Sequence, residues 1–273
     1  ANLSDDNADG LINADDIPDI VVASYSGGAY TSAGILTAMS GDGTGVLWSV
    51  YQPGGQATYG CTAPAIGDLD GDGRPEVCAA GVSAAVVCLD GTSGALLWAS
   101  GSETSAYGGP AIADMDGDGL AEVILGRQVF RHDGTPWWVG AGGQGSPYQF
   151  SFAVDWDLDG AQEVVAGSTI YETDGSILWT HGYEDGMPAV GDFTGDGLPD
   201  LVQVGGGYVT VINNDGKVNS SSKTSSKFHH TDFEFSGVLL TIIQTVGIKE
   251  LLAHIKEAER HETPEYKTHD LTS

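Results

Sequence analysis

The chain has 273 residues and a formal net charge of −28, and 41% of its residues are hydrophobic. It is therefore long enough to bury a sizeable core, and its composition argues against wholesale disorder. Residues 1–216 contain no lysine and only three arginines. Because so acidic a body cannot neutralise phosphates, we exclude nucleic acids and anionic membranes as partners. No apolar run is long enough to span a bilayer, so we expect no membrane insertion.

The first acidic segment is residues 5–16, which read "DDNADGLINADD". It resembles an EF-hand loop with Asp5, Asn7, Asp9 and Asp16 at ligand positions. Residues 17–24, "IPDIVVAS", follow directly and match residues 74–81, "RPEVCAAG". We therefore interpret the segment as an extended loop inserted into the first of several repeats. A rival register aligns Asn2-Leu3 with Asp68-Leu69, and the sequence leaves both alignments open.

A shorter acidic loop then recurs four times, as "DLDGDGRPE" (68–76), "DMDGDGLAE" (114–122), "DWDLDGAQE" (155–163) and "DFTGDGLPD" (192–200). Asp-Gly pairs recur in step with it, at 42–43, 90–91, 133–134, 174–175 and 215–216. Four units also end in a tryptophan pattern, "LW" or "WW". The loops start 46, 41 and 37 residues apart, and recurrence at such intervals is typical of a repeat protein.

Each unit divides into four strand-sized segments, for example 64–68, 76–80, 85–89 and 95–98. The acidic loop joins the first two segments, and the Asp-Gly pair joins the last two as a tight hairpin prefers. We therefore predict an all-β fold, a β-propeller of four-stranded blades with about five repeat units visible. The first unit lacks its opening strand. Trp48, Trp98, Trp138 and Trp179 are expected to pack between blades.

The units resemble the FG-GAP (VCBS-type) repeat, the calcium-binding blade that is also found in the propeller of integrin α-subunits. The segments "PAIGDLDGDGRPEV", "PAIADMDGDGLAEV" and "PAVGDFTGDGLPDL" carry the resemblance, and "FAVDWDLDGAQEV" is a looser copy. It covers residues 1 to about 216. The resemblance implies a propeller that binds calcium, and its relatives commonly serve in recognition at the cell surface.

The spacing of the acids has a chemical reason, because Ca²⁺ takes six to eight oxygen ligands and alternate residues of a curled loop face one centre. An unneutralised cluster would strain the fold. The first, third, fifth and ninth loop residues offer side-chain oxygens, and the seventh offers its carbonyl. We expect about four to five ions, the one beside Thr194 being bound more weakly. The predicted ligands of the four loops are Asp68, Asp70, Asp72, Arg74 and Glu76; Asp114, Asp116, Asp118, Leu120 and Glu122; Asp155, Asp157, Asp159, Ala161 and Glu163; Asp192, Thr194, Asp196, Leu198 and Asp200.

Cys78 and Cys88 flank a turn that would bring them opposite each other, where a disulfide and two buried thiols are both compatible with the sequence. We place the propeller at residues 1–218 and a flexible Ser/Lys linker at 219–227. Residues 228–273 form a C-terminal segment that contains an amphipathic helix. This segment could mediate self-association.

The expected function is that of a secreted or cell-surface calcium-binding propeller, a binding or adhesion module for a carbohydrate or protein ligand. No catalytic constellation is recognisable, so we do not expect an enzyme. The alternatives are a propeller enzyme (a polysaccharide lyase or a quinoprotein-like dehydrogenase) and a structural spacer of a larger surface protein. An enzyme that holds a polyanion needs Arg or Lys, which this body largely lacks.

Overall fold

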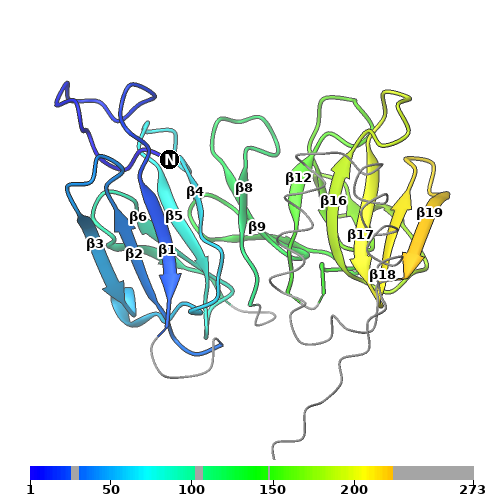
Figure 1. The fold of residues 1–273 in the computed structure, drawn as a ribbon, viewed down its shortest axis with the longest axis horizontal. Coiled ribbons are helices and arrows are strands. Elements are labelled where there is room, and N and C mark those ends of the chain that lie inside the picture. The colour runs from blue at the N-terminus through cyan, green and yellow to red at the C-terminus, as the bar shows by residue number, and fades with distance from the viewer. Residues whose placement is uncertain (26–30, 102–106, 147, 224–273) are drawn as a thin grey trace, which may run out of the picture. The chain divides into compact units, whose positions relative to one another are not determined.

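The computed structural model describes residues 1–25, 31–101, 107–146 and 148–223. These residues form an all-β fold of five antiparallel sheets (Figure 1). A single 3-10 turn, η1 (Pro53–Gly55), is the only helical element among them. No helix in the described part of the chain is long and apolar enough to cross a bilayer. The all-β expectation is confirmed.

The strands are short, and each sheet takes consecutive strands of the chain. The first sheet consists of β1 (Ile20–Ser24), β2 (Ile35–Met39) and β3 (Val46–Tyr51); the second of β4 (Ala65–Gly67), β5 (Glu76–Ala80), β6 (Val86–Asp90) and β7 (Leu96–Ala99); the third of β8 (Ala111–Ala113), β9 (Glu122–Leu125), β10 (Gln128–Phe130) and β11 (Pro136–Val139); the fourth of β12 (Phe152–Val154), β13 (Glu163–Ala166), β14 (Thr169–Tyr171) and β15 (Ile177–Thr180); the fifth of β16 (Met187–Gly191), β17 (Asp200–Gly205), β18 (Tyr208–Ile212) and β19 (Val218–Lys223).

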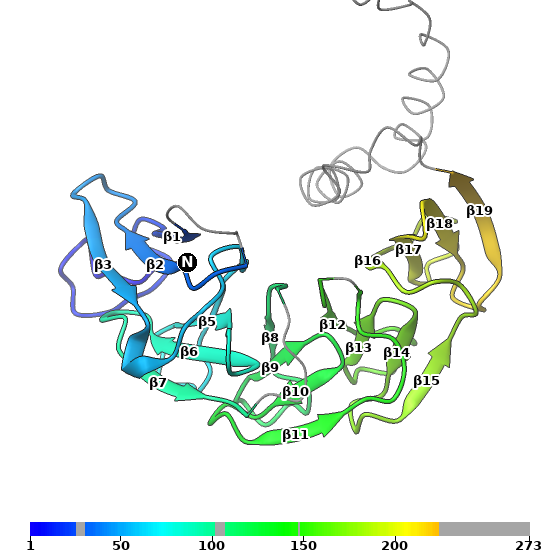
Figure 2. The same cartoon turned by 90° about the horizontal axis from the view of Figure 1, so that it is seen from below.

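Within each sheet the strands pair in chain order, as in a propeller blade. Figure 2 shows the sheets following one another along the chain, with β8, β12 and β16 on the inner side and β7, β11 and β15 on the outer side. The first sheet has three strands, because residues 1–19 form no strand ahead of β1. This confirms that the first unit lacks its opening strand.

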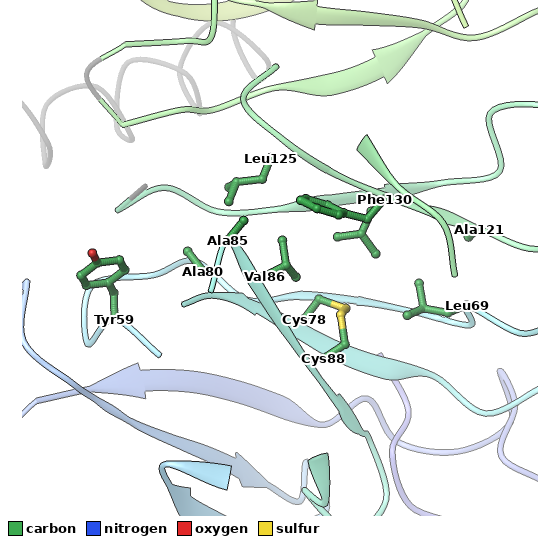
Figure 3. Packing of buried hydrophobic residues seen from close by; sticks show 11 residues of the cluster. Tyr59, Leu69, Cys78, Ala80, Ala85, Val86, Cys88, Ala121, Leu125 and Phe130 are labelled. Carbon is green, nitrogen blue, oxygen red and sulfur yellow. A yellow bond between two sulfur atoms is a disulfide. The ribbon is translucent and has the colours of Figure 1, made fainter. Parts of the chain in front are cut away.

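The core lies between neighbouring sheets, where small and β-branched side chains of facing strands interlock. Cys78 on β5 and Cys88 on β6 are directly opposed and form a disulfide, whereas Cys61 is free. Figure 3 shows this disulfide among buried residues that include Leu69 from the first short acidic loop and Phe130 from the third sheet. The structure thus selects the disulfide from the two options that the sequence left open.

Consecutive sheets are joined by a tryptophan that packs on the next sheet's hairpin turn. The indole N–H of Trp98 donates to the carbonyl of His132 at 2.8 Å, and the ring covers Gly134, where an added Cβ would lie 2.6 Å from it. The same contact repeats for Trp48 on Gly94, Trp138 on Gly175 and Trp179 on Gly216. All four turn glycines have positive φ. The predicted packing role of the tryptophans is confirmed.

The fifth sheet extends further along the chain than we predicted. Strand β19 pairs with β18 from Ile212↔Val218 to Tyr208↔Lys223, so residues 219–223 are sheet rather than linker. A serine-rich composition indicates flexibility, but backbone pairing does not depend on apolar side chains, and Ser221 hydrogen-bonds across the pair to Thr210 at 3.1 Å. Residues 224–273, which include the rest of the linker and the predicted amphipathic helix, lie outside the described residues.

The tryptophan–turn contact can be tested with a matched pair of glycines. Gly134 and Gly43 occupy the same turn position with φ of 83° and 84°, but an added Cβ at Gly43 meets nothing within 4 Å. Both Ala variants incur the left-handed backbone cost of about 1–2 kcal/mol. Gly134→Ala must also displace Trp98, so we expect it to lose roughly 1–3 kcal/mol more in urea unfolding. Equal losses in the two variants would contradict this account of sheet packing.

Candidate metal centres

The four short acidic loops connect the first and second strands of the second to fifth sheets. Each loop begins after a strand of at most five residues, and its last acid is the first residue of the next strand: Glu76 on β5, Glu122 on β9, Glu163 on β13 and Asp200 on β17. The two flanking strands therefore fix both ends of every loop, and the backbone between them forms a tight turn.

Backbone hydrogen bonds to the aspartates produce the curl. In the loop 68–76, the carboxylate of Asp68 accepts the N–H of Gly71 at 2.8 Å and that of Gly73 at 2.9 Å. Both glycines have positive φ, which glycine adopts without steric cost. Asp114 and Asp192 each accept the same two glycine N–H groups in their own loops. Fixing the first carboxylate in this way turns its neighbours toward a common centre.

The third loop departs from this pattern at its fourth residue. Leu158 stands where the other loops have glycine, and it adopts a φ of 63° that costs a branched side chain roughly 1–2 kcal/mol. One carboxylate oxygen of Asp155 is buried without a hydrogen-bond partner among the described residues. This explains physically why "DWDLDGAQE" is the looser copy of the repeat.

The last acid of each loop is buried beneath it. Glu122 and Asp200 are 0% exposed, Glu163 is 1% exposed and Glu76 is 6% exposed. Each accepts the N–H of the apolar second loop residue at 2.7–3.0 Å, from Leu69, Met115, Trp156 and Phe193 in turn. The side chains of the first three of these residues are buried, and that of Phe193 is half-buried. The side chain of the apolar residue therefore packs in the core, while its backbone N–H donates a hydrogen bond to the buried acid.

Burial of these acids opposes their ionisation. It raises the pKa of Glu76 to about 7; the N–H of Leu69 counteracts this, and the charges of the loop aspartates add to it. Burial likewise raises the pKa of Glu122 and of Glu163, with Asp116 and Asp157 adding to the respective shifts. A cation in the loop would remove this repulsion and restore the charged form.

Three of the loops bring carboxylate oxygens close enough for one ion. The ligand atoms of each group lie within 4.8 Å of one another: Asp68, Asp70 and Glu76; Asp114, Asp116 and Glu122; Asp155, Asp157 and Glu163. Carboxylate oxygens on a curled loop are the donors that hard divalent cations prefer, so the residues present fit such an ion. These three clusters can hold metal ions.

The aspartates at the fifth loop position, which we also predicted as ligands, are not among the clustered groups. The fifth-position aspartates, Asp72, Asp118, Asp159 and Asp196, each accept the N–H of the seventh residue, which is Arg74, Leu120, Ala161 and Leu198 respectively. In the fourth loop Thr194 replaces a carboxylate, and one oxygen of the buried Asp200 has no partner among the described residues. The weaker ion binding that we expect at this loop stays a prediction.

The segment 5–16 curls in the same way as the shorter loops. Asp5 accepts the N–H of Gly10 at 2.8 Å, and Asp16, which is 5% exposed, accepts the N–H of Asp6 at 3.0 Å. The first and last acids of the short loops accept from the same relative positions, the sixth residue and the second. Two further predicted ligands accept backbone N–H groups inside the loop, Asn7 and Asp9.

Sequence reasoning missed Asp19. It is 5% exposed and accepts the N–H of Leu3 at 2.7 Å, as Glu76 accepts that of Leu69. Leu3 is 1% exposed and packs in the core between the first two sheets. The register that aligns Asn2-Leu3 with Asp68-Leu69 therefore holds for the blade, and the segment 5–16 is inserted within it. The match of "IPDIVVAS" to "RPEVCAAG" already aligned Asp19 with Glu76 and could have identified it.

Comparison with known proteins supports the reading of the repeats. Residues 12–79 match the family described as FG-GAP-like repeat. This segment is therefore similar to an FG-GAP-like repeat. The match includes the loop 68–76 and the end of the inserted segment, and it confirms the resemblance on which the calcium expectation was based. No curated protein sequence matches the chain significantly.

Solved structures extend the likeness to most of the chain. The biofilm matrix protein Bap1 of V. cholerae superposes with a TM-score of 0.71 and 28% identity, over 82% of this chain and 38% of Bap1. Rhamnogalacturonan lyase PL11 of Bacillus licheniformis gives a TM-score of 0.50 at 20% identity, over 72% of this chain and 40% of the lyase. The exotype rhamnogalacturonan lyase YesX gives a TM-score of 0.50 at 22% identity, over 70% of this chain and 38% of YesX. The chain thus spans about two fifths of these proteins, and the likeness to the lyases shows the fold alone.

Removal of divalent cations should destabilise the fold, because each ion that binds only the folded chain adds RT ln(1 + [Ca²⁺]/Kd) to its stability. With several sites occupied at 100 times Kd, each contributes about 2.7 kcal/mol. We expect EGTA to lower the Tm by many degrees and excess Ca²⁺ to restore it, measured by calorimetry. A Tm that is the same in protein shown by elemental analysis to be metal-free would contradict the assignment.

Arg131 should weaken ion binding in the loop 114–122. Its Nη1 lies 2.6 Å from Asp116 and 3.2 Å from Glu122, and the guanidinium lies 3.7 Å from the centre of the Trp137 ring. An ion must compete with this charge for the same oxygens. We therefore expect Arg131→Gln to tighten one Ca²⁺ site by up to about fivefold in titration calorimetry, since an ion pair with partly exposed groups contributes up to about 1 kcal/mol.

Arg74→Gln provides the matched control for Arg131→Gln. It removes the same charge from within another acidic loop, 68–76, and leaves the backbone carbonyl of residue 74 in place; no ion pair to the Arg74 side chain occurs among the described residues. Its effect should be smaller. Equal effects of the two variants would point to long-range charge instead of competition for Asp116, and unchanged binding in Arg131→Gln would refute the competition.

Proposed function

We propose that the chain is a calcium-binding propeller module of a secreted or cell-surface protein, and that it acts in adhesion by binding a carbohydrate or protein ligand. The observation that carries this proposal is the likeness to Bap1, a biofilm matrix protein, over 82% of the chain. That likeness runs through the repeats that hold the acidic loops. The chain covers 38% of Bap1, so the activity of the whole protein is part of the proposal.

The chemistry of the chain supports an extracellular setting. The Cys78–Cys88 disulfide is of a kind that persists in oxidising compartments. Calcium sites with several carboxylates each fit an environment in which Ca²⁺ is abundant, and the net charge of −28 favours solubility there. We infer Ca²⁺ as the bound ion and four to five sites, because three loops hold complete carboxylate groups and two more curl in the same manner.

A polysaccharide lyase is the second candidate, because two lyases share the fold. Its weakness is the scarcity of cations: of the three arginines in residues 1–216, Arg131 pairs with acidic side chains, and Arg127 donates to the carbonyl of Gly142. An acidic substrate would therefore have to be held through bound Ca²⁺. A purely structural spacer is the third candidate.

Binding and turnover can be compared directly on the purified chain. We expect capture on an array of bacterial polysaccharides and surface proteins with Ca²⁺ present, loss of capture in EGTA, and no release of unsaturated uronate from rhamnogalacturonan. Release of that product would favour the lyase. Failure to capture any ligand with Ca²⁺ present would favour the spacer and contradict the proposal.

A further inference from the structure

The fifth sheet carries a cavity that the metal loops do not explain. Its volume is about 410 Å³, within the range of about 300–1,000 Å³ that is usual for ligand pockets. It lies where β17, β18 and β19 meet the connection that leaves the fourth sheet. The lining side chains are Tyr183, Glu184, Gln203, Tyr208, Thr210 and Ser221.

A short connection leaves this cavity open. The third and fourth sheets are connected by residues 140–151, of which Gly143 donates its N–H to the hydroxyl of Thr169 at 2.8 Å. Thr210 is the equivalent of Thr169, because each lies five residues before the aspartate of its Asp-Gly turn. The connection to the fifth sheet is only residues 181–186, half as long. Thr210 bonds to Ser221 of its own sheet and remains in the cavity wall.

The floor of the cavity is polar and fixed. Gln203 is 3% exposed, and its Nε2 donates to the carbonyl of Glu184 at 2.6 Å. Its Oε1 is buried near the ring of His181. Neither this oxygen nor Nε2 of His181 has a hydrogen bond of normal geometry among the described residues, but burial lowers the pKa of His181 and the interaction between the two side chains counteracts this shift. Thr210 is also buried. The Gln203 amide is thus positioned by Glu184 and His181, and a ligand that hydrogen-bonds to it does not have to order it first.

The walls of the cavity are aromatic. Tyr183 and Tyr208 expose large parts of their rings, 54% and 44% of the residue surface. His181 positions Tyr183, because the N–H of Tyr183 donates to Nδ1 of His181 at 3.2 Å and the two rings lie 5.5 Å apart. The His181 ring in turn lies 5.6 Å from Trp179. A positioned ring loses little freedom when a ligand packs against it.

The charged side chain that lines the cavity is acidic. None of its described lining residues is a lysine or arginine, and the carboxylate of Glu184 lies so close to Gly206 that an added Cβ there would be 2.5 Å from Oε2. Lys223 on β19 is paired with Tyr208 at the edge of this sheet. Rings that offer flat apolar surface, together with amide and hydroxyl groups, match a molecule with apolar C–H faces and a rim of hydroxyls. We propose that this cavity binds a neutral saccharide unit, with Gln203 and Thr210 contacting its hydroxyls and the two tyrosines its ring faces.

This inference rests on the proposed binding function and gives it a place and a ligand class. The test uses the full chain with Ca²⁺ and the methyl glycosides of glucose, galactose, mannose, fucose and N-acetylglucosamine as probes, with galacturonate as the charged probe. Binding is followed by saturation-transfer NMR and titration. We expect at least one neutral glycoside to bind, and galacturonate not to compete with it.

The variants Tyr183→Ala and Tyr208→Ala locate the binding. Both side chains are largely exposed, so the fold should survive, and each change should weaken binding by about tenfold. Tyr51→Ala, on β3 and 59% exposed, is the matched control and should bind as the unaltered chain does. Unchanged affinity in both pocket variants, preference for galacturonate, or no binding of any neutral glycoside would overturn the inference.

The outcomes separate this inference from the proposed function. If polysaccharides or surface proteins are captured on the array while the pocket variants capture them equally well, the cavity assignment fails and the binding function stands. If no ligand of any class is captured with Ca²⁺ present, the binding function fails as well.

Discussion

A buried carboxylate at the start of the second strand of each blade organises the structure. In the second sheet this is Glu76, which accepts the N–H of Leu69 while the Leu69 side chain enters the core. One acid thereby connects the start of a strand to the acidic loop and fixes the backbone of the apolar residue that is buried beneath the loop. The same hydrogen bond is made in the other blades by Glu122, Glu163, Asp200 and Asp19. Each acidic loop is therefore attached to the hydrophobic core at its second residue.

In this arrangement the acid at the end of each loop is buried, and burial disfavours its charged form. An acid kept out of water beside several aspartates favours its protonated form, as the raised pKa of Glu76 shows. The N–H of Leu69 offsets part of this effect, and a cation at the loop centre would make burial and ionisation compatible. The large negative charge of the chain is thus concentrated where it serves the fold.

Much of this architecture was predictable because its signals are local and repeated. Strand bounds, hairpin turns and the tryptophan anchors follow from spacing alone, and the acids at alternate positions predicted the clusters that the structure forms. The rest depends on contacts that spacing does not contain. Asp19 was missed because the inserted segment displaces it from the loop's own register, and β19 was missed because serine composition says nothing of backbone pairing. Arg131 lies 15 residues beyond the aspartate that it contacts.

The cavity on the fifth sheet illustrates where such a repeat protein has freedom to acquire a ligand site. The repeated parts are constrained, because each of these tryptophans packs on a turn glycine and each acidic loop holds a buried acid. The connections between sheets carry no such duty, and their lengths differ, so that residues 140–151 fill a space that residues 181–186 leave open. Polar groups that the longer connection would satisfy, such as the hydroxyl of Thr210, then face a cavity. Variation in connection length is sufficient to convert one of several equivalent sheet boundaries into a binding site while the metal loops and the tryptophan contacts stay unchanged.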